Sequence, residues 1–504
     1  MMIFHANLNY AYLPEHRYEF VIRKSYELIF DTMRNNFPGT KYVFEASGFT
    51  IEQIALKTPD VLEKLKLAIS NGECEFMGSP YAHPMLPNFP KKDGIRSLGF
   101  SNEIYSKYLG FQPISFWNPE CGWRSYVPEI IAESGYKNLV GDFEAYSRSL
   151  DNNSKPLRPE IYEKEHSDDP SFYSFDFKYD LPGTERAIHF PFNKVQSLED
   201  DALKVFLRSD RIAQFGVRYF MGMEGYTFEK YLNLIKKYSA QNEGEEEGAL
   251  VIFADDAEYI GTNGWFRLKY ENKPDNVFEH TPQSKEKLIE LVTECLKIGS
   301  FTTFADSCST LPCMSESISF DDDSAWHGAR ASTWANTPMA KLLRPWQNLI
   351  REELQQSKRL DYNLKNKIWY HLTNSYNSDG QWPPTLPNAP HIIHPFNYKY
   401  CFDNLLIADQ LLGGNFISKL ENSPVETLKA ILIPQGMLIK KKAKELAMFS
   451  NNEDALLALK LLDTCLDFTA IETSKSKILY PSEYESRANM LVEARRLVGG
   501  VEIE

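Results

Sequence analysis

The chain has 504 residues, enough for one large catalytic domain and a second domain, and its 43% hydrophobic and 25% charged residues are typical of a folded protein. A formal net charge of −14 argues against general nucleic-acid binding, because a phosphate backbone selects basic surfaces. The seven cysteines have no regular spacing, which favours a reducing compartment over a disulfide framework.

The first residues lead directly into an apolar run, without the basic region or small-residue cleavage site of a signal peptide. No stretch of the sequence reaches the roughly 18–20 apolar residues of a membrane-spanning helix. We therefore expect a cytoplasmic protein with neither a nucleic-acid nor a membrane partner. The sequence carries no signal for a particular oligomeric state.

Strand-like runs alternate with helical patterns over the first 300 residues. The expected strands are Met2–Asn9, Tyr42–Ala46, Glu73–Gly78, Ile114–Asn118, Asn138–Phe143, Ala187–Phe192, Ala249–Ala254 and Phe301–Phe304. Among the helices between them, Pro59–Ile69 has apolar residues at intervals of three or four and Thr58 at its N-cap. This alternation predicts βα units and a mainly parallel sheet, and seven or eight strands favour a closed or nearly closed barrel.

After about residue 310 the patterns are almost entirely helical. The expected helices there are Pro345–Leu360, Tyr362–Leu372, Phe402–Leu412, Val425–Ile433, Gly436–Phe449, Glu453–Leu466 and Ser486–Val498. We therefore expect a catalytic barrel over residues 1–310 and a helical C-terminal domain over residues 311–504, packed at the mouth of the barrel.

Carboxylates follow two of the expected strands directly. In an α/β barrel the reacting groups lie at the carboxyl ends of the strands. Glu120 lies at one such end, and Asp255, Asp256 and Glu258 lie at another. A carboxylate in this place is costly unless it is solvated, paired or used, and two of them facing each other are what glycosidic cleavage needs. Taken alone, the residues also allow structural carboxylates that cap loops or helices.

Five motifs in this order resemble those of glycoside hydrolase family 57. They are His5–Tyr10, Gly72–Phe76 with His83-Pro84 downstream, Trp117–Cys121, Asp256–Gly261 and Ser378–Pro383. The resemblance implies an α/β fold with a distorted (β/α)7-type barrel and a mainly helical C-terminal region. It also implies action on α-linked glucans or oligosaccharides, as by an α-amylase or a 4-α-glucanotransferase, with no metal and no organic cofactor.

The resemblance also implies roles for individual residues. Glu120 falls on the nucleophile of a retaining mechanism and Asp256 on its general acid/base, so the two carboxyl groups should lie about 5–5.5 Å apart. Asp255 is the alternative acid/base, because a shift of one residue in register exchanges it with Asp256. The implied substrate-binding residues are His5, Asn7, His83, Trp117, Trp265 and Asp379.

Two departures from the family pattern keep other functions open. Asn7 stands where the first motif has a second histidine, and Asn9 stands where it has a proline. These substitutions allow a carbohydrate-binding relative without turnover. A metal-dependent polysaccharide deacetylase is a further alternative, since Asp255 and Asp256 resemble its metal-binding pair. A deacetylase also needs a His-x-x-x-His pair to complete its metal site, and the sequence has no such pair.

Overall fold

The computed structural model describes most of the chain, in two compact units. The described residues are 1–9, 13–150, 185–199, 201–240, 247–264, 278–326, 329–335, 338–381, 395–414, 424–449, 452–469 and 481–499. The boundary between the units falls between Ser332 and Thr333. The segment before this boundary belongs to the first unit because it pairs with the loop after the fourth strand. Ser324 O accepts a hydrogen bond from Trp123 N at 2.8 Å, and Asp323 N donates one to Trp123 O at 3.0 Å.

The first unit is built on seven parallel strands. They are β1 (Met2–Ala6), β2 (Tyr42–Ser47), β3 (Cys74–Ser79), β4 (Ser115–Phe116), β5 (Asn138–Asp142), β6 (Lys204–Arg208) and β7 (Phe253–Asp256). Their order in the sheet is β6-β5-β4-β3-β2-β1-β7. The charges of Arg208 on β6 and Asp255 on β7 interact, so the two edges of the sheet curve toward each other. This curled half-barrel confirms the expected fold class.

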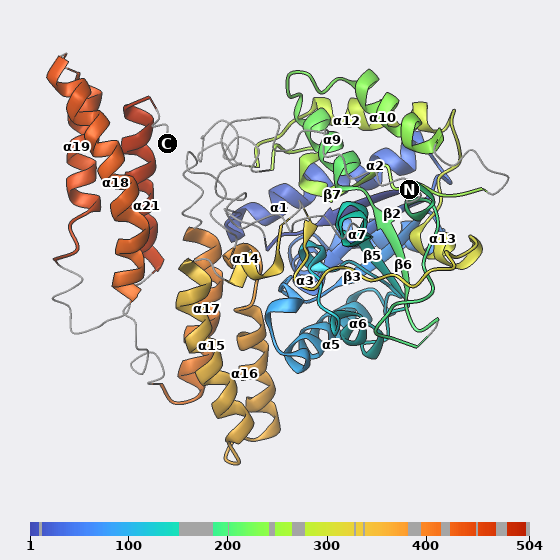
Figure 1. The fold of residues 1–504 in the computed structure, drawn as a ribbon, viewed down its shortest axis with the longest axis horizontal. Helices are drawn as coiled ribbons and strands as arrows, with labels where there is room; N and C mark the ends of the chain where they lie inside the picture. The colour runs from blue at the N-terminus through green and yellow to red at the C-terminus, as the bar shows by residue number, and fades with distance from the viewer. Residues whose placement is uncertain are drawn as a thin grey trace. The chain divides into compact units, whose positions relative to one another are not determined.

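Helices cover the strands of this unit. They are α1 (Tyr18–Val21), a π-helix η2 (Ile22–Tyr26), α2 (Glu27–Asn36), α3 (Gly48–Lys57), α4 (Pro59–Ser70), α5 (Lys91–Tyr108), α6 (Val127–Glu133), α7 (Phe143–Leu150), α9 (Asp210–Met221), α10 (Phe228–Ala240), α12 (Gln283–Cys295) and α13 (Phe304–Thr310). Figure 1 shows α5 and α6 on one side of the strands and α9, α10 and α12 on the other. Nearly all strand residues are buried, on both faces of the sheet, which explains why the strands are near-continuous apolar runs.

The sixth strand was misplaced by the sequence analysis. The expected strand Ala187–Phe192 is wrong, since its first residues lie in the 3-10 helix η5 (Glu185–Ile188). Phe192 makes only isolated bridges, an antiparallel one to Val205 in β6 and a parallel one to Met314. The apolar run at 187–192 thus packs beside the true strand. A short apolar segment that is buried without being a strand has the same sequence pattern as a buried strand.

The expected strand Phe301–Phe304 is also wrong. The Thr303 side chain accepts a hydrogen bond from Asp306 N and so caps α13, which begins at Phe304. A threonine at the N-cap competes with extended pairing by satisfying a free backbone N–H of the first helical turn.

The second unit is helical in its described parts. Its helices are α15 (Pro338–Gln356), α16 (Tyr362–Asn374), α17 (Pro395–Leu411), α18 (Pro424–Phe449), α19 (Glu453–Cys465) and α21 (Pro481–Leu497), and α14 (Ala331–Ala335) crosses the boundary between the units. Figure 1 shows α18, α19 and α21 side by side. None of the helices described is long and apolar enough to cross a membrane.

Two of the expected C-terminal helices are a single helix, α18. Gly436 lies inside it rather than at a boundary between Val425–Ile433 and Gly436–Phe449. A Cβ at this position would lie 2.8 Å from the side chain of Leu466, so the glycine allows close packing of neighbouring chain segments. A glycine inside a helix costs about 1 kcal/mol relative to alanine, and close packing offsets that cost.

Gly261 gives a test of the turn that follows β7. Its φ is +99°, and a Cβ would lie 1.8 Å from the backbone oxygen of Lys24 in η2. We expect Gly261→Ala to lower the free energy of unfolding by more than about 3 kcal/mol, because the backbone must move to relieve the clash. Urea denaturation followed by circular dichroism measures the change.

Gly110 supplies the matched control, since its φ is +86° and no atom lies within 4 Å of the added Cβ. We expect Gly110→Ala to cost about 1–2 kcal/mol, the penalty of the left-handed conformation alone. Equal losses in the two variants would contradict the close approach of the Gly261 turn to η2.

Candidate active site

Three titratable residues lie side by side at the carboxyl ends of neighbouring strands. In the sheet register His5 on β1 is opposite Glu45 on β2 and opposite Asp256 on β7. The exposed fractions of the three residues are 2%, 0% and 7%, respectively. Buried charged groups need partners, and these three residues supply partners for one another.

The imidazole of His5 joins the three residues. Its Nδ1 is hydrogen-bonded to the carboxylate of Glu45, and its Nε2 lies 3.9 Å from Oδ1 of Asp256. Its ring stacks on Trp117, with centroids 4.9 Å apart and planes 15° apart. The ring of His83 lies at the same centroid distance, tilted by 36°. Residues from β1, β2, β7 and the loops after β3 and β4 therefore converge on one side chain.

The surroundings of His5 favour its charged form. Burial alone would lower the pKa of His5, but the charge and hydrogen bond of Glu45 and the charges of Asp256 and Glu258 raise it to about 10. Burial and the charge of His5 lower the pKa of His83 well below its usual value. At neutral pH the site thus holds one imidazolium, His5, next to one neutral imidazole, His83.

The two adjacent aspartates at the end of β7 have different surroundings. Asp255 Oδ2 accepts a hydrogen bond from Gln214 Nε2 at 2.7 Å, and its Oδ1 accepts one from the backbone N–H of Asp256 at 2.9 Å. Both oxygens of Asp255 thus hold α9 and the strand end in place. Asp256 instead has an oxygen beside the imidazolium of His5.

Glu258 holds the loop that follows β1. Its Oε1 accepts hydrogen bonds from the backbone N–H of Asn7, at 2.9 Å, and from the hydroxyl of Tyr26. Burial raises the pKa of Glu258 to about 7, although these hydrogen bonds and the charge of His5 act in the opposite direction. The Asn7 side chain accepts a hydrogen bond from Asn9 N at 3.1 Å, so the Asn7 amide also shapes this loop.

Glu120 lies in a strained turn after β4. It belongs to the 3-10 helix η4 (Pro119–Cys121), has a φ of +56° and is 2% exposed. Cys121 follows with a φ of +48°. A left-handed conformation at a residue other than glycine costs about 1–3 kcal/mol and is found mostly at functional sites.

Hydrogen bonds of the surrounding loop fix that conformation. Cys121 N donates to Asn118 O at 2.9 Å, and Gly122 N donates to Pro119 O at 3.0 Å. The side chain of Asn118 spans the turn and donates to Gly122 O at 2.5 Å. The carboxylate of Glu120 is therefore presented by a preorganised loop, three residues after the Trp117 ring that stacks on His5.

Arg208 is a member of this region that the sequence analysis missed. It ends β6 and is fully buried, with Nη1 2.9 Å from Asp210 Oδ1 and 3.5 Å from Asp142 Oδ2. Its guanidinium carbon lies 5.9 Å from the ring centroid of Trp117 and 5.1 Å from that of Trp326. An arginine at the carboxyl end of an apolar strand could have marked Arg208 as a site residue, but the sequence analysis had placed the sixth strand elsewhere.

The remaining predicted site residues differ in where they lie. Trp117 is fully buried, and its ring lies near His5, Arg208 and Trp326. Asp379 lies in the 3-10 helix η9 (Asp379–Gln381) of the second unit, where it is buried. Trp265 lies outside the described residues.

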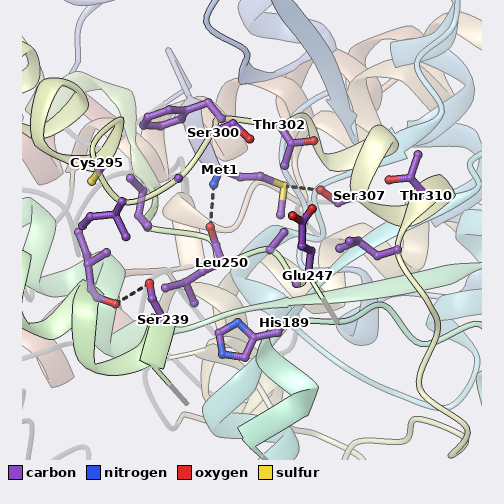
Figure 2. A pocket seen from close by; sticks show the side chains of 18 residues that line it. Met1, His189, Ser239, Glu247, Leu250, Cys295, Ser300, Thr302, Ser307 and Thr310 are labelled. Carbon is purple, nitrogen blue, oxygen red and sulfur yellow. Dashed lines mark hydrogen bonds between the residues drawn. The ribbon is translucent and has the colours of Figure 1, made fainter. Parts of the chain in front are cut away.

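A cavity at the other end of the strands contains none of the predicted site residues. It has a volume of about 380 Å³ and is lined by Met1, His189, Leu250 and Cys295, among others (Figure 2). Met1 precedes β1, and its amino group donates to Leu250 O at 2.7 Å. In the described ranges of the chain, no three His, Cys, Asp or Glu side chains are grouped so that they could hold a metal ion.

Comparisons with known proteins identify the family of the chain. The family model described as glycosyl hydrolase family 57 matches residues 3–294, and the chain belongs to that family. It is 31% identical over 133 residues to "Alpha-amylase 1" of Dictyoglomus thermophilum, a match that covers 26% of this chain and 19% of that protein. It is 22% identical over 299 residues to "4-alpha-glucanotransferase" of Thermococcus kodakarensis, covering 59% of this chain and 44% of that protein.

A solved structure shares the fold over nearly the full length of both chains. The GH57-type branching enzyme of Pyrococcus horikoshii has a TM-score of 0.56 and 11% identity, covering 98% of this chain and 96% of that one. The matches to the two curated relatives, by contrast, span less than half of either relative's length.

The charge on His5 predicts a pH-dependent stability. The pKa of His5 is about 10 in the folded protein and about 6.5 when unfolded, so the folded state holds an extra proton between these values. The stability that His5 contributes is fully present below about pH 6.5 and is lost as the pH rises through 10. The difference in unfolding free energy between wild type and His5→Gln should therefore shrink from pH 7 to 9, by up to about 1.4 kcal/mol per pH unit.

Urea denaturation of both proteins at several pH values measures this difference. Subtracting the variant removes the contributions of the titrating groups that do not interact with His5. Glu258 does interact with it, and the loss of the His5 charge raises the pKa of Glu258 in the variant, so the shrinkage stays below this limit. A difference that stays constant across this range would mean that His5 is neutral in the folded protein.

Proposed function

We propose that this protein is a retaining glycoside hydrolase or transglycosylase that acts on α-linked glucans or oligosaccharides. The observation that carries the proposal is the convergence on His5. Trp117, three residues before Glu120, stacks on the His5 ring, and Asp256 Oδ1 lies 3.9 Å from its Nε2. Glu120 and Asp256 thus belong to chain segments that meet at His5, and their carboxylates are the proposed catalytic pair of this member of family 57.

In the first step of the proposed reaction, the carboxylate of Glu120 attacks the anomeric carbon. The bond to the glycosidic oxygen breaks, and Asp256 donates its proton to that oxygen as the leaving sugar departs. The product is a covalent glycosyl-enzyme on Glu120. This double role needs the two carboxyl groups about 5–5.5 Å apart, the separation typical of retaining enzymes.

In the second step, Asp256 acts as a base. It accepts the proton of a water molecule or of a sugar hydroxyl, whose oxygen attacks the anomeric carbon and releases Glu120. Water as the acceptor gives hydrolysis, and a sugar hydroxyl gives transfer. The names of the relatives, alpha-amylase and 4-alpha-glucanotransferase, correspond to these two outcomes.

The hydrogen bonds of Asp255 support Asp256 as the acid/base. A general acid must release and regain its proton in every cycle, and a carboxylate that accepts structural hydrogen bonds on both oxygens is poorly suited to this. Asp255 uses one oxygen for Gln214 and the other for the strand end. The strained backbone at Glu120 supports the nucleophile in a similar way, because strain is retained where geometry matters.

Polar residues around this pair complete the proposed site. A neutral His83 can both donate and accept a hydrogen bond, as sugar hydroxyls require. His5 and Asn7 lie at the same end of β1, and Trp117 stacks on the His5 ring. We keep Trp265 and Asp379 as proposed substrate-binding residues on the family resemblance alone.

Product analysis of Glu120→Gln tests the proposed function. We would incubate wild type and the variant with amylose, maltooligosaccharides and glycogen and separate the products by chromatography. Wild type should yield shorter or rearranged oligosaccharides, and Glu120→Gln should lose at least about 10³-fold in rate, because an amide cannot replace the nucleophile. The variant should still bind the oligosaccharides in calorimetric titration.

Glu63→Gln is the matched control, since Glu63 is a surface residue whose exposed carboxylate is paired with Lys66. It should retain full activity. Near-normal turnover by Glu120→Gln would overturn the mechanism. Oligosaccharide binding without turnover by the wild type would instead indicate a carbohydrate-binding protein.

Comparing Asp256→Asn with Asp255→Asn tests the choice of the acid/base. A glycosyl fluoride leaves without protonation, so a variant that lacks the acid should cleave it far better than it cleaves an oligosaccharide. For Asp256→Asn we expect a loss of about 10²–10⁴-fold on maltooligosaccharides and a much smaller loss of initial rate on α-glucosyl fluoride. For Asp255→Asn we expect similar losses on both substrates, because structural damage does not depend on the leaving group. The reverse pattern would assign the acid/base role to Asp255.

A further inference from the structure

We propose that Glu45 is a positioning residue for Asp256 and that it acts through the imidazole of His5. This inference rests on the proposed function, because it concerns the residue that serves there as acid/base. Glu45 itself contacts neither the nucleophile turn nor Asp256 in the interactions described above. Its effect on the reaction must therefore pass through the histidine between them.

The geometry forms a relay across three neighbouring strands. In the sheet register Glu45 on β2 is opposite His5 on β1, which is opposite Asp256 on β7. One ring nitrogen of His5 is bonded to Glu45, and the other faces Asp256 at 3.9 Å. A hydrogen bond at Nδ1 fixes the rotation of the ring and so fixes where Nε2 points.

The hydrogen bond to His5 is the main interaction of the Glu45 carboxylate within the described part of the chain. Glu45 is fully buried, and within the described part of the chain its Oε1 has no hydrogen-bond partner, while Oε2 binds His5. A buried ion pair stabilises a fold weakly, and apolar residues can often replace one at no cost. The sheet therefore gains little from a glutamate at this position, and its one bond favours a role at the site.

Two aromatic rings contact the imidazole of His5. Trp117 lies parallel to the His5 ring, and His83 lies nearby with a neutral ring. The ring can neither tilt away from Asp256 nor exchange Glu45 for another partner without moving these neighbours. Together with Glu45 they leave His5 one orientation.

The positive charge of His5 acts on the ionisation of Asp256. The charged and titratable groups that face His5 are Glu45 from β2, His83 after β3, Asp256 from β7 and Glu258 from the turn after β7, with Tyr26 bonded to Glu258. A positive charge beside a carboxylate favours its ionised form. Because His5 is positively charged, we expect Asp256 to lose the proton that it donates in the first step at a lower pH than it would without this neighbour. The same charge draws an oxygen of Asp256 toward Nε2 for the second step.

Removing the charge of Glu45 should weaken the imidazolium and so move the alkaline limit of activity. In Glu45→Gln, we expect the alkaline limb of the kcat/KM profile to shift upward by about one pH unit, since Asp256 loses its positive neighbour. We also expect kcat to fall about ten-fold or more with little change in KM, because a misoriented acid affects the reaction step rather than binding.

Several variants make this result specific. His5→Gln should shift the alkaline limb in the same direction, and the double variant should shift it no further, because both act through one group. Glu75→Gln is the matched control. Glu75 is a glutamate on the neighbouring strand β3, with a carboxylate bonded to the backbone N–H of Ala305. Its substitution should leave the pH profile where it is.

A second readout does not depend on turnover. The imidazole signals of His5 in nuclear magnetic resonance should show a protonated ring at pH 8 in wild type and a ring that loses its proton at lower pH in Glu45→Gln. Should Glu45→Gln fail to fold, Glu45→Asp keeps the charge but withdraws it by one methylene. It should then give a smaller upward shift and a smaller loss of kcat.

A folded Glu45→Gln protein with the wild-type alkaline limb and the wild-type His5 titration would overturn the positioning role. A wild type without turnover on any of the glycosides would overturn the proposed function, and the catalytic role of Glu45 with it. The two failures are distinct, because only the first is seen in an active wild-type enzyme.

Discussion

A buried imidazolium between two carboxylates is the interaction on which the site depends. His5 holds a proton because Glu45 and Asp256 are opposite it in the sheet register, and that register is set by burial of the β1, β2 and β7 side chains. A shift of one residue in either pairing would turn these side chains to the other face of the sheet. The core therefore fixes the electrostatics of the site as well as the shape of the barrel.

The turn that carries Glu120 is both strained and buried. Glu120 and Cys121 adopt positive φ angles, which residues other than glycine take rarely, and the hydrogen bonds of Asn118 and Gly122 hold this turn in place. Trp117 connects this turn to His5 by stacking. Preorganisation of this kind is what the transition state of glycosidic cleavage rewards, since groups already in place need not reorganise during the reaction.

The sequence predicted most of the strands and the end of the barrel at which the carboxylates lie, because hydrophobic runs and strand ends are local signals. It could not separate the strand Lys204–Arg208 from the buried run at 187–192, since both are apolar and only pairing distinguishes them. Arg208 was missed for that reason. Nor could the sequence show that Asp255 is hydrogen-bonded to Gln214, 41 residues away in the chain, whereas Asp256 lies beside His5.

Trapping the covalent intermediate tests the central claim most directly. A 5-fluoro-α-glucosyl fluoride reacts quickly and then hydrolyses slowly, so a retaining enzyme accumulates a glycosyl adduct that mass spectrometry of the digested protein can locate. The mechanism predicts one fluoroglucosyl group on the peptide that carries Glu120, and none in Glu120→Gln. An adduct on another carboxylate, or turnover of this reagent with inversion and no adduct, would contradict it.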